Sequence, residues 1–306
     1  MAITLQESLR AIFYAPFYVA LARGAFEAEG VEIEFASSPR PQDAAVRLMD
    51  GTVDVCWGGP MRVMQTYQQL PGCDIVSFAE VVTRDPFLLM GREPRPDFKF
   101  ADLQKVKLAT VSEVPTPWMC LQHDLREAGI DPGSIKRVAD QAMDRNMASL
   151  KVGTVDVVQV FEPFPSLSLA DKAAHVWYAA ARRGPTSYTT LYARRGLLSS
   201  RRDELKRMVR AIYRTELWVA QATGHAVAEA IALYFEDVPP WILDAACERY
   251  KALGIWSGTP VLPRAGYERL RQSLVSGGFV SPGTPFETAV DNSLAEEIIT
   301  ERLPPL

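Results

Sequence analysis

The sequence is poor in histidine and cysteine. Its 306 residues contain three histidines and four cysteines, Cys56, Cys73, Cys120 and Cys247, with no Cys-x-x-Cys pair among them. Zinc sites need such residues at short, regular spacing, so the sequence predicts no metal site. The apolar or helical surroundings of the cysteines favour buried free thiols. Their spacing leaves open whether any of them pair.

Sequence motifs for nucleotide binding and for serine hydrolysis are also missing. The chain has no G-x-G-x-x-G, no G-x-x-x-x-G-K-[ST] and no G-x-S-x-G. Each histidine lies in a helical or apolar segment, where a structural or surface position is more common than a catalytic one. The sequence therefore predicts no catalytic residue and no cofactor.

Long apolar runs are absent, and no stretch is apolar enough to span a membrane. Residues 1–7 lack the basic region and the apolar region of a signal peptide. Two interpretations stay open: the protein is cytosolic, or a signal peptide was removed before this sequence begins.

Charge of one sign is not concentrated either. The net charge is −4, and the arginine pairs are short and scattered, which argues against nucleic acid as a partner. Hydrophobic residues make up 48% and charged residues 23%, an ordinary globular balance. A chain of 306 residues predicts about two domains.

An internal repeat organises the chain. The pentapeptide Gly-Thr-Val-Asp-Val occurs at residues 51–55 and again at residues 153–157. Each copy ends a segment with the same predicted order, strand-helix-strand-helix-strand. In the first half these elements are expected at residues 3–9, 16–29, 31–35, 41–49 and 53–57, and in the second half at residues 106–111, 117–128, 135–138, 144–152 and 155–161. Strands alternating with helices predict parallel sheets, here two doubly wound α/β lobes.

Two further strands, at residues 86–91 and 188–193, are predicted to cross between the lobes as a hinge. The alternative is that each is an edge strand of one lobe. Residues from about 201 onward are largely helical and are expected to pack on the first lobe. The first lobe then comprises residues 1–85 and 195–306, and the second comprises residues 86–194 with the hinge strands.

At this point the sequence resembles a protein family. Ala-Pro-Phe-Tyr-Val-Ala at residues 15–20, Gly-Ala-Phe at 24–26 and Glu-Gly-Val-Glu-Ile at 29–33 look like the opening of one branch of ABC-transporter substrate-binding proteins. That branch takes up nitrate, alkanesulfonates, taurine and thiamine-pyrimidine precursors. The Gly-x-Val-Asp step in each half and the Glu162-Pro163 pair are similar to the family's pattern, and the resemblance covers most of residues 1–195.

The resemblance implies a type II periplasmic-binding-protein fold, in which two lobes close on a small-molecule ligand. It also implies a membrane permease as partner and a periplasmic or surface-anchored location. The missing signal peptide departs from this pattern. We expect a monomer.

Candidate ligand residues in the first lobe follow the ends of the predicted strands, where open α/β sheets bind ligands. Phe13 and Tyr14 are predicted to form an aromatic wall, with Arg10 as an anion partner; the alternative is that these rings fill the core. Ser38 and Arg40, in the segment around Pro39, can bind an anion or simply cap the next helix, which is expected to begin near Pro41.

The segment Trp57-Gly58-Gly59 offers a flat stacking face and a backbone that a ligand can approach closely. A core position for Trp57 is the alternative, because large aromatic side chains are mostly buried.

In the second lobe, Ser112, Thr116 and Trp118 surround the expected start of a helix, with Thr116 as its N-cap and Pro117 as its first residue. Glu162 can accept hydrogen bonds from a ligand amine or, alternatively, lie at the surface or in a hinge contact. Thr83 and Tyr188, near the hinge strands, complete the set. This mixture predicts a planar or amphipathic solute, for example one resembling a pyrimidine or a sulfonate.

The main alternative function is a cytosolic enzyme of the same fold that makes the thiamine pyrimidine. The resemblance places a pyridoxal-phosphate lysine and a consumed histidine in the first lobe of that enzyme, together with a cysteine-rich motif. Here residues 1–98 contain neither lysine nor histidine, and no cysteine cluster occurs. A ligand-sensing transcription regulator is a further alternative, but the chain begins directly in the first strand, without a helix-turn-helix.

Overall fold

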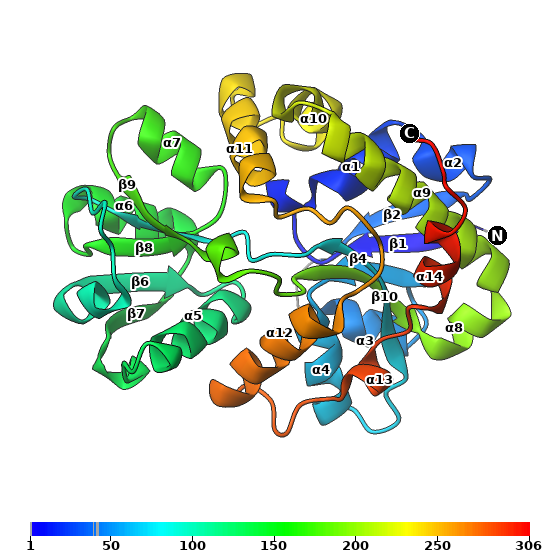
Figure 1. Ribbon diagram of the computed structural model, residues 1–306, viewed down its shortest axis with the longest axis horizontal. Helices are drawn as coiled ribbons and strands as arrows, with labels where there is room; N and C mark the ends of the chain where they lie inside the picture. Colours follow the sequence, from blue (N-terminus) through cyan, green and yellow to red (C-terminus); the bar gives the residue numbers. More distant parts are fainter. Residues whose placement is uncertain (1, 39, 41–42) are drawn as a thin grey trace.

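The structure of the protein is a computed structural model that describes residues 2–38, 40 and 43–306. Two five-stranded sheets lie side by side, each covered by helices (Figure 1). The predicted two-lobe α/β fold is confirmed. Both sheets are mixed, however, and not purely parallel, because antiparallel strands pair beside the predicted parallel ones. We call each sheet with the helices packed on it a lobe.

The first sheet has the strand order β2-β1-β3-β10-β4. Its strands are β1 (Ile3–Glu7), β2 (Ile33–Ser37), β3 (Val55–Gly58), β4 (Ile75–Val82) and β10 (Thr189–Arg194). Strands β2 and β3 flank β1 in parallel, as predicted, while β10 runs antiparallel to both β3 and β4.

The second sheet repeats this plan with the order β7-β6-β8-β5-β9. Its strands are β5 (Leu88–Gly91), β6 (Lys107–Val111), β7 (Lys136–Gln141), β8 (Val157–Val160) and β9 (His175–Ala179). Strands β4 and β9 were not predicted from the sequence, and they extend the two sheets beyond the parallel units.

Helices α1 (Ala15–Ala22), α2 (Ala25–Ala28), α3 (Asp43–Met49) and α4 (Pro60–Gln69) belong to the first lobe, and α5 (Thr116–Glu127), α6 (Met143–Val152) and α7 (Phe164–Ala170) to the second. The single helix predicted at residues 16–29 is broken, because Gly24 adopts a left-handed conformation with φ of 66°. Pro39, next to two of the predicted ligand residues, and Pro41, the predicted start of the second helix, lie outside the described residues. Short 3-10 helices are η1 (Ile12–Tyr14), η2 (Phe100–Lys105), η3 (Pro132–Ser134), η4 (Ala180–Arg183) and η5 (Ala232–Tyr234).

The repeated pentapeptide has the same structural task in both lobes. The carboxylate of Asp54 accepts a hydrogen bond from the backbone N–H of Thr4 at 3.0 Å, and Asp156 accepts one from Lys107 at 2.8 Å. Each aspartate thus holds the start of the first parallel strand against the start of the third. The glycine three residues earlier has a positive φ in both copies, 78° at Gly51 and 80° at Gly153, so its lack of a side chain is required.

The predicted hinge strands lie elsewhere than expected. Strand β5 pairs on both sides with β8 and β9, and β10 pairs on both sides with β3 and β4, so each is internal to one sheet and neither crosses nor lies at an edge. The chain passes between the lobes at residues 83–87 and 180–188, which we call the crossovers. The division at residues 85 and 194 stays a prediction, although β10, placed in the second lobe, pairs in the first sheet.

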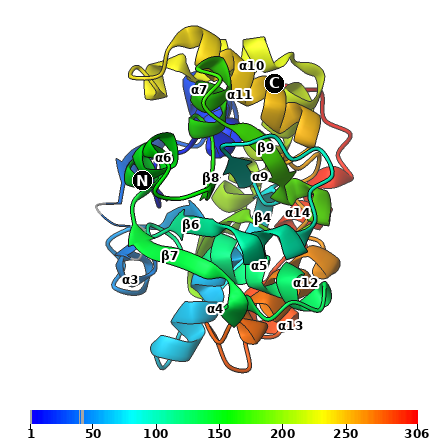
Figure 2. The same cartoon turned by 90° about the vertical axis from the view of Figure 1, so that its left-hand side faces the viewer.

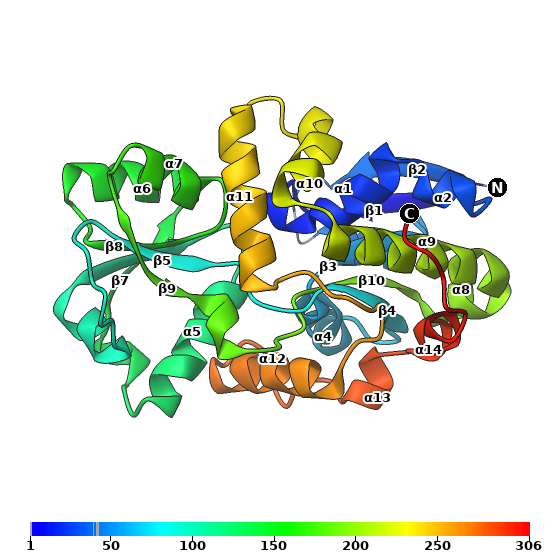
Figure 3. The same ribbon diagram turned by 45° about the horizontal axis from the view of Figure 1, so that its top comes forward.

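The C-terminal part of the chain is helical, as predicted. Its helices are α8 (Arg195–Ser200), α9 (Arg202–Gln221), α10 (Gly224–Ile231), α11 (Pro240–Leu253), α12 (Arg264–Ser276), α13 (Phe286–Ala289) and α14 (Ser293–Ile299). Helix α9 packs on α1 and α2 of the first lobe. Figure 3 shows α11 and α12 on opposite sides of the crossovers, at the boundary between the lobes. Viewed from the second lobe, α7 lies near α11 and α5 near α12 (Figure 2).

Among the described residues, no helix has both the length and the apolar character needed to cross a lipid bilayer.

Candidate functional site

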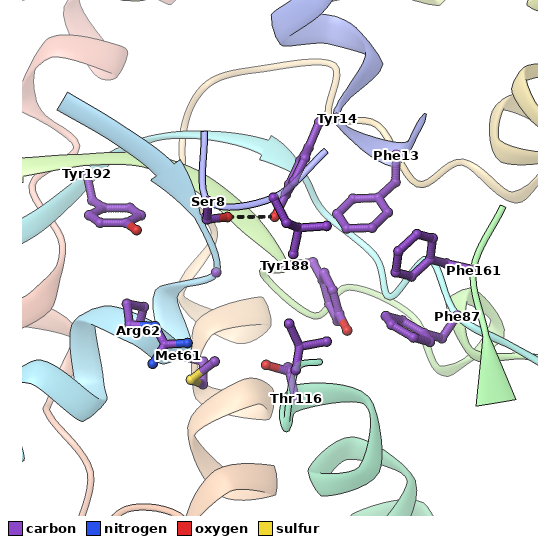
Figure 4. A pocket seen from close by; sticks show the side chains of 14 residues that line it. Ser8, Phe13, Tyr14, Met61, Arg62, Phe87, Thr116, Phe161, Tyr188 and Tyr192 are labelled. Atoms are coloured by element: carbon purple, nitrogen blue, oxygen red, sulfur yellow. Dashed lines mark hydrogen bonds between the residues drawn. The ribbon is translucent and has the colours of Figure 1, made fainter. Parts of the chain in front are cut away.

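A narrow cavity lies between the lobes, beside the crossovers (Figure 4). It is lined by Ser8, Leu9, Phe13, Tyr14, Gly58, Gly59, Met61, Arg62, Phe87, Val114, Thr116, Phe161, Tyr188 and Tyr192. The cavity is small: the space open to the centres of water molecules is about 40 Å³, which is enough for only a few waters. Entry of an organic solute therefore requires the lobes or the lining side chains to move apart.

One wall of the cavity is aromatic and joins the two lobes. The ring of Phe161, from the second lobe, meets the edge of Phe13 at a centroid distance of 5.3 Å and that of Phe87 at 5.2 Å. These three rings lie on one side of the cavity, while Met61 and Arg62 lie on the other (Figure 4). Such edge-to-face packing presents apolar surface to a ligand from both lobes at once.

Three tyrosines, Tyr14, Tyr188 and Tyr192, bring hydroxyl groups to the cavity. The hydroxyls of Tyr14 and Ser8 are 3.3 Å apart, while those of Tyr188 and Tyr192 are buried and have no hydrogen-bond partner within the part of the chain that the structure describes. Burial raises the pKa of Tyr14 to about 12 and those of Tyr188 and Tyr192 well above their usual value. All three stay protonated at neutral pH and can donate hydrogen bonds to an acceptor on a ligand.

Of the described residues that line the cavity, Arg62 alone has a charged side chain. It is the third residue of α4, whose first turn follows directly from Gly58 and Gly59 at the end of β3. Its Nη1 donates to Gln65, and no carboxylate accepts a hydrogen bond from it among the described residues. Burial lowers its pKa, yet a guanidinium stays charged in proteins. A partly buried cation that donates to Gln65 and to no carboxylate of the described residues favours an anionic group beside it.

The two glycines allow the backbone to pack closely around the cavity. A Cβ on Gly58 would lie 3.1 Å from the Tyr192 hydroxyl, and one on Gly59 would lie 3.2 Å from the Tyr188 carbonyl. The close approach of a ligand to these glycines stays a prediction; the close contacts in the structure are with the protein's own tyrosines.

The comparison with known proteins agrees with this architecture. Residues 12–223, more than half of the chain, match the family described as NMT1/THI5 like. The chain belongs to the NMT1/THI5-like family. The predicted resemblance to substrate-binding proteins of ABC transporters is thereby confirmed.

Individual relatives of this NMT1/THI5-like chain are distant. "Putative binding protein YtlA" of Bacillus subtilis (strain 168) is 25% identical over 302 residues, covering 98% of this chain and 90% of YtlA. The periplasmic aliphatic sulphonate binding protein SsuA of Escherichia coli shares the fold with a TM-score of 0.75 at 15% identity, over 92% of this chain and 94% of SsuA. The desulfurization enzyme DszB shares it too, with a TM-score of 0.72 at 14% identity, over 98% of this chain and 100% of DszB.

In the NMT1/THI5-like chain, part of the predicted ligand set meets at the cavity. These residues come from both lobes and a crossover: Phe13, Tyr14, Gly58, Gly59, Thr116 and Tyr188. Thr116 lines the cavity but does not cap α5, because α5 begins at Thr116 itself, after Pro115, with no side-chain cap.

Arg10, Ser38 and Arg40 lie outside the lining. The Arg10 guanidinium is paired with the buried carboxylate of Glu7, at 2.7 Å, and so is not a free anion partner. Ser38 donates its hydroxyl hydrogen to the Arg40 carbonyl, at 2.6 Å. Arg40 is 67% exposed and pairs with Asp43.

Trp57 is fully buried in the first lobe. Its indole stacks on Phe17 at a centroid distance of 4.5 Å and on Phe35 at 5.4 Å. Both faces are therefore covered by the protein's own rings, and the alternative core position describes Trp57 in this structure.

Other predicted residues of the NMT1/THI5-like chain also have partners away from the cavity. Ser112 is exposed, and its N–H donates to Glu113. Trp118 packs in the second lobe under the guanidinium of Arg137, 4.3 Å from the ring centre. The N–H of Thr83 donates to the Ile255 carbonyl, and Glu162 pairs with Arg249.

Several residues that line the cavity were not among the predicted ligand residues: Ser8, Leu9, Met61, Arg62, Phe87, Val114, Phe161 and Tyr192. Arg62 had a usable signal, since a helix that begins at Pro60 directs its first turn toward the same strand end as Gly58 and Gly59. Tyr192 had none, because β10 reaches this site only by pairing with β3.

Proposed function

We propose that this protein captures a small organic anion between its two lobes, as the substrate-binding component of an ABC uptake transporter. The observation that carries the proposal is Arg62, a partly buried cation in a cavity lined by aromatic rings, whose guanidinium donates to no carboxylate among the described residues.

The two sides of the cavity suit the two ends of such a ligand. A carboxylate or sulfonate beside Arg62 can accept charge-assisted hydrogen bonds from the guanidinium and further ones from the tyrosine hydroxyls. The rest of the ligand, planar or aliphatic, then lies against Phe13, Phe87 and Phe161. This arrangement refines the amphipathic, sulfonate-like solute expected from the sequence.

Binding without chemistry fits the side chains of the lining. The described residues of the lining include no cysteine, histidine, lysine, aspartate or glutamate, so they offer no activated thiol and no carboxylate or imidazole as a general base. The same composition disfavours the alternative of a thiamine-pyrimidine enzyme, which needs a lysine and a histidine in its first lobe. DszB shows that the fold also serves an enzyme, so the test below includes the chemical fate of the ligand.

The membrane permease and a periplasmic location belong to the same proposal. The family and the two-lobe fold support them, since SsuA, a periplasmic binding protein, has this architecture. We expect a monomer.

The experiment is a thermal-shift and calorimetry screen with methanesulfonate, benzenesulfonate and benzoate, against neutral benzamide and benzyl alcohol. The anions should stabilise the protein in a saturable way and be recovered unchanged by mass spectrometry. Arg62→Gln should weaken the best anion about 10- to 100-fold, the loss of one charge-assisted hydrogen-bonding group.

Arg40→Gln is the matched control, because this arginine is exposed and outside the cavity. Equal binding of neutral and anionic probes, or an unchanged affinity in Arg62→Gln, would contradict the proposal. Conversion of a bound probe would make the protein an enzyme.

A further inference from the structure

Helix α11 is attached to the first lobe by its C-terminal end. In the segment that follows it, Ile255 accepts a hydrogen bond from Thr83 at 2.8 Å, and Ser257 donates one to the Val81 carbonyl at 2.9 Å. The indole N–H of Trp256 donates to the Phe13 carbonyl at 3.0 Å. Tyr250 of α11 is fully buried in the same hydrophobic cluster. The helix therefore moves with the first lobe.

The second lobe is tied to this helix at Glu162. Its carboxylate, 0% exposed, accepts a hydrogen bond from Nε of Arg249 at 2.7 Å. The backbone N–H of Glu162 donates to the Tyr250 hydroxyl at 2.8 Å. Arg249 and Tyr250 are neighbours on α11, so two bonds of different kinds join the same point of the second lobe to the first. We call these contacts the Glu162 latch.

The latch is directly connected to the cavity and to the second lobe's own fold. Phe161, which closes the aromatic wall, precedes Glu162 in the chain. The second carboxylate oxygen of Glu162 accepts the N–H of Ser166, in the first turn of α7, at 3.0 Å. Because Phe161 and Glu162 are adjacent, the contacts that keep Glu162 on α11 also keep the ring of Phe161 next to that of Phe13.

Separation of the lobes breaks the latch. Arg249 is 28% exposed and can be rehydrated, but Glu162 would lose its cationic partner. Breaking a buried pair is costly because a charge is left uncompensated. The latch consequently favours the arrangement in which the lobes are together.

We propose that Glu162 is a positioning residue: it does not touch the ligand, and its contacts with Arg249 and Tyr250 set the fraction of molecules in which the lobes are closed without ligand. A ligand that binds only the closed arrangement has an apparent affinity that scales with this fraction. The proposal goes beyond the proposed function and concerns the ligand-free protein, so it is independent of the solute's identity.

The test compares the ligand-free wild type with Arg249→Gln, Arg249→Lys and Tyr250→Phe by small-angle X-ray scattering and hydrogen-deuterium exchange. Arg249→Gln should increase the radius of gyration and accelerate deuterium uptake at residues 161–166 roughly fivefold or more. Arg249→Lys keeps the charge and should lie between wild type and Arg249→Gln. Tyr250→Phe should act in the same direction.

The matched control is Arg210→Gln. Arg210 is 23% exposed and pairs with Glu29 and Glu301, which do not belong to the second lobe. It should leave both measurements at the wild-type level. The proposal is overturned if Arg249→Gln, shown to be folded by circular dichroism, matches Arg210→Gln in radius and in exchange. A general rise in exchange across both lobes would likewise overturn it, since that outcome indicates lost stability and not lobe opening.

Discussion

Single side chains next to the cavity have tasks that their neighbours in sequence do not share. Trp57 is buried between two rings, while Gly58, the next residue, lines the cavity. In a strand, consecutive side chains point to opposite faces, so one residue can belong to the core and the next to the site. Aromatic residues are typical both of ligand-binding surfaces and of hydrophobic cores. The sequence alone could not decide which of the two positions Trp57 has.

Trp57→Ala should lower the free energy of unfolding by about 3–5 kcal/mol, because it leaves a large cavity between Phe17 and Phe35. Urea denaturation followed by circular dichroism measures this change. Trp241→Ala is the control, since Trp241 is 59% exposed and its loss should cost less than about 0.5 kcal/mol. If Trp57→Ala were as stable as the wild type but had lost ligand binding, Trp57 would be a ligand-binding residue and not a core residue.

Glu80 predicts a specific dependence of stability on pH. Its carboxyl is buried in β4, and burial raises its pKa from 4.5 to about 8. The buried Glu216 of α9 also has a raised pKa, first through burial and then through the charge of Glu80. Glu80 binds its proton more tightly when folded, so its contribution to stability is fully present below about pH 4.5 and is lost as the pH rises to about 8.

Glu80→Gln should remove this loss, which is on the order of 3–5 kcal/mol. The difference in unfolding free energy between variant and wild type should therefore favour the variant more at pH 8 than at pH 5. Urea titrations at both pH values measure it, with the exposed Glu236→Gln as control. A difference that is the same at both pH values would show that Glu80 is not protonated in the folded protein.

The two lobes share the same arrangement of strands in their sheets, although their sequences are alike only in a short repeat. The parallel β-α-β-α-β units could be predicted because hydrophobic periodicity and glycine stops are local signals. The antiparallel strands β4, β9, β5 and β10 could not be placed, because their neighbours come from distant segments: β10 lies between β3 and β4.

The paired aspartates should behave alike. Asp54→Ala and Asp156→Ala should each destabilise the protein by about 1–3 kcal/mol, since each leaves a strand-start N–H without its acceptor. The effects should add in the double variant, because the two sites lie in different lobes. Chemical denaturation of the two single variants and the double variant tests this. A large effect in one lobe only would show that the repeated aspartates are not equivalent in stability.

The two lobes of the molecule are joined by more than the two crossovers. Arg183 of the second crossover is 3% exposed; its guanidinium donates to Asp85 of the first crossover at 2.8 Å and to Asp124 of α5 at 2.7 Å. Helix α12 packs on α5, and α11 on α7. The cavity therefore lies in a boundary held from several sides, and the Glu162 latch is the contact closest in sequence to its aromatic wall.

Local sequence signals were enough to establish the doubled α/β plan, the helical C-terminal part and the family, because strand and helix periods, glycine stops and a repeated Gly-x-Val-Asp step act over a few residues. Part of the site followed from the same logic, since Phe13, Tyr14, Gly58, Gly59 and Thr116 come after predicted strands. The positions of Arg62 and Tyr192 at the cavity, of Trp57 in the core and of Glu162 against α11 were decided by tertiary packing. Each of these positions depends on a contact with a residue far away in the chain. Local sequence patterns do not show which distant segments come into contact.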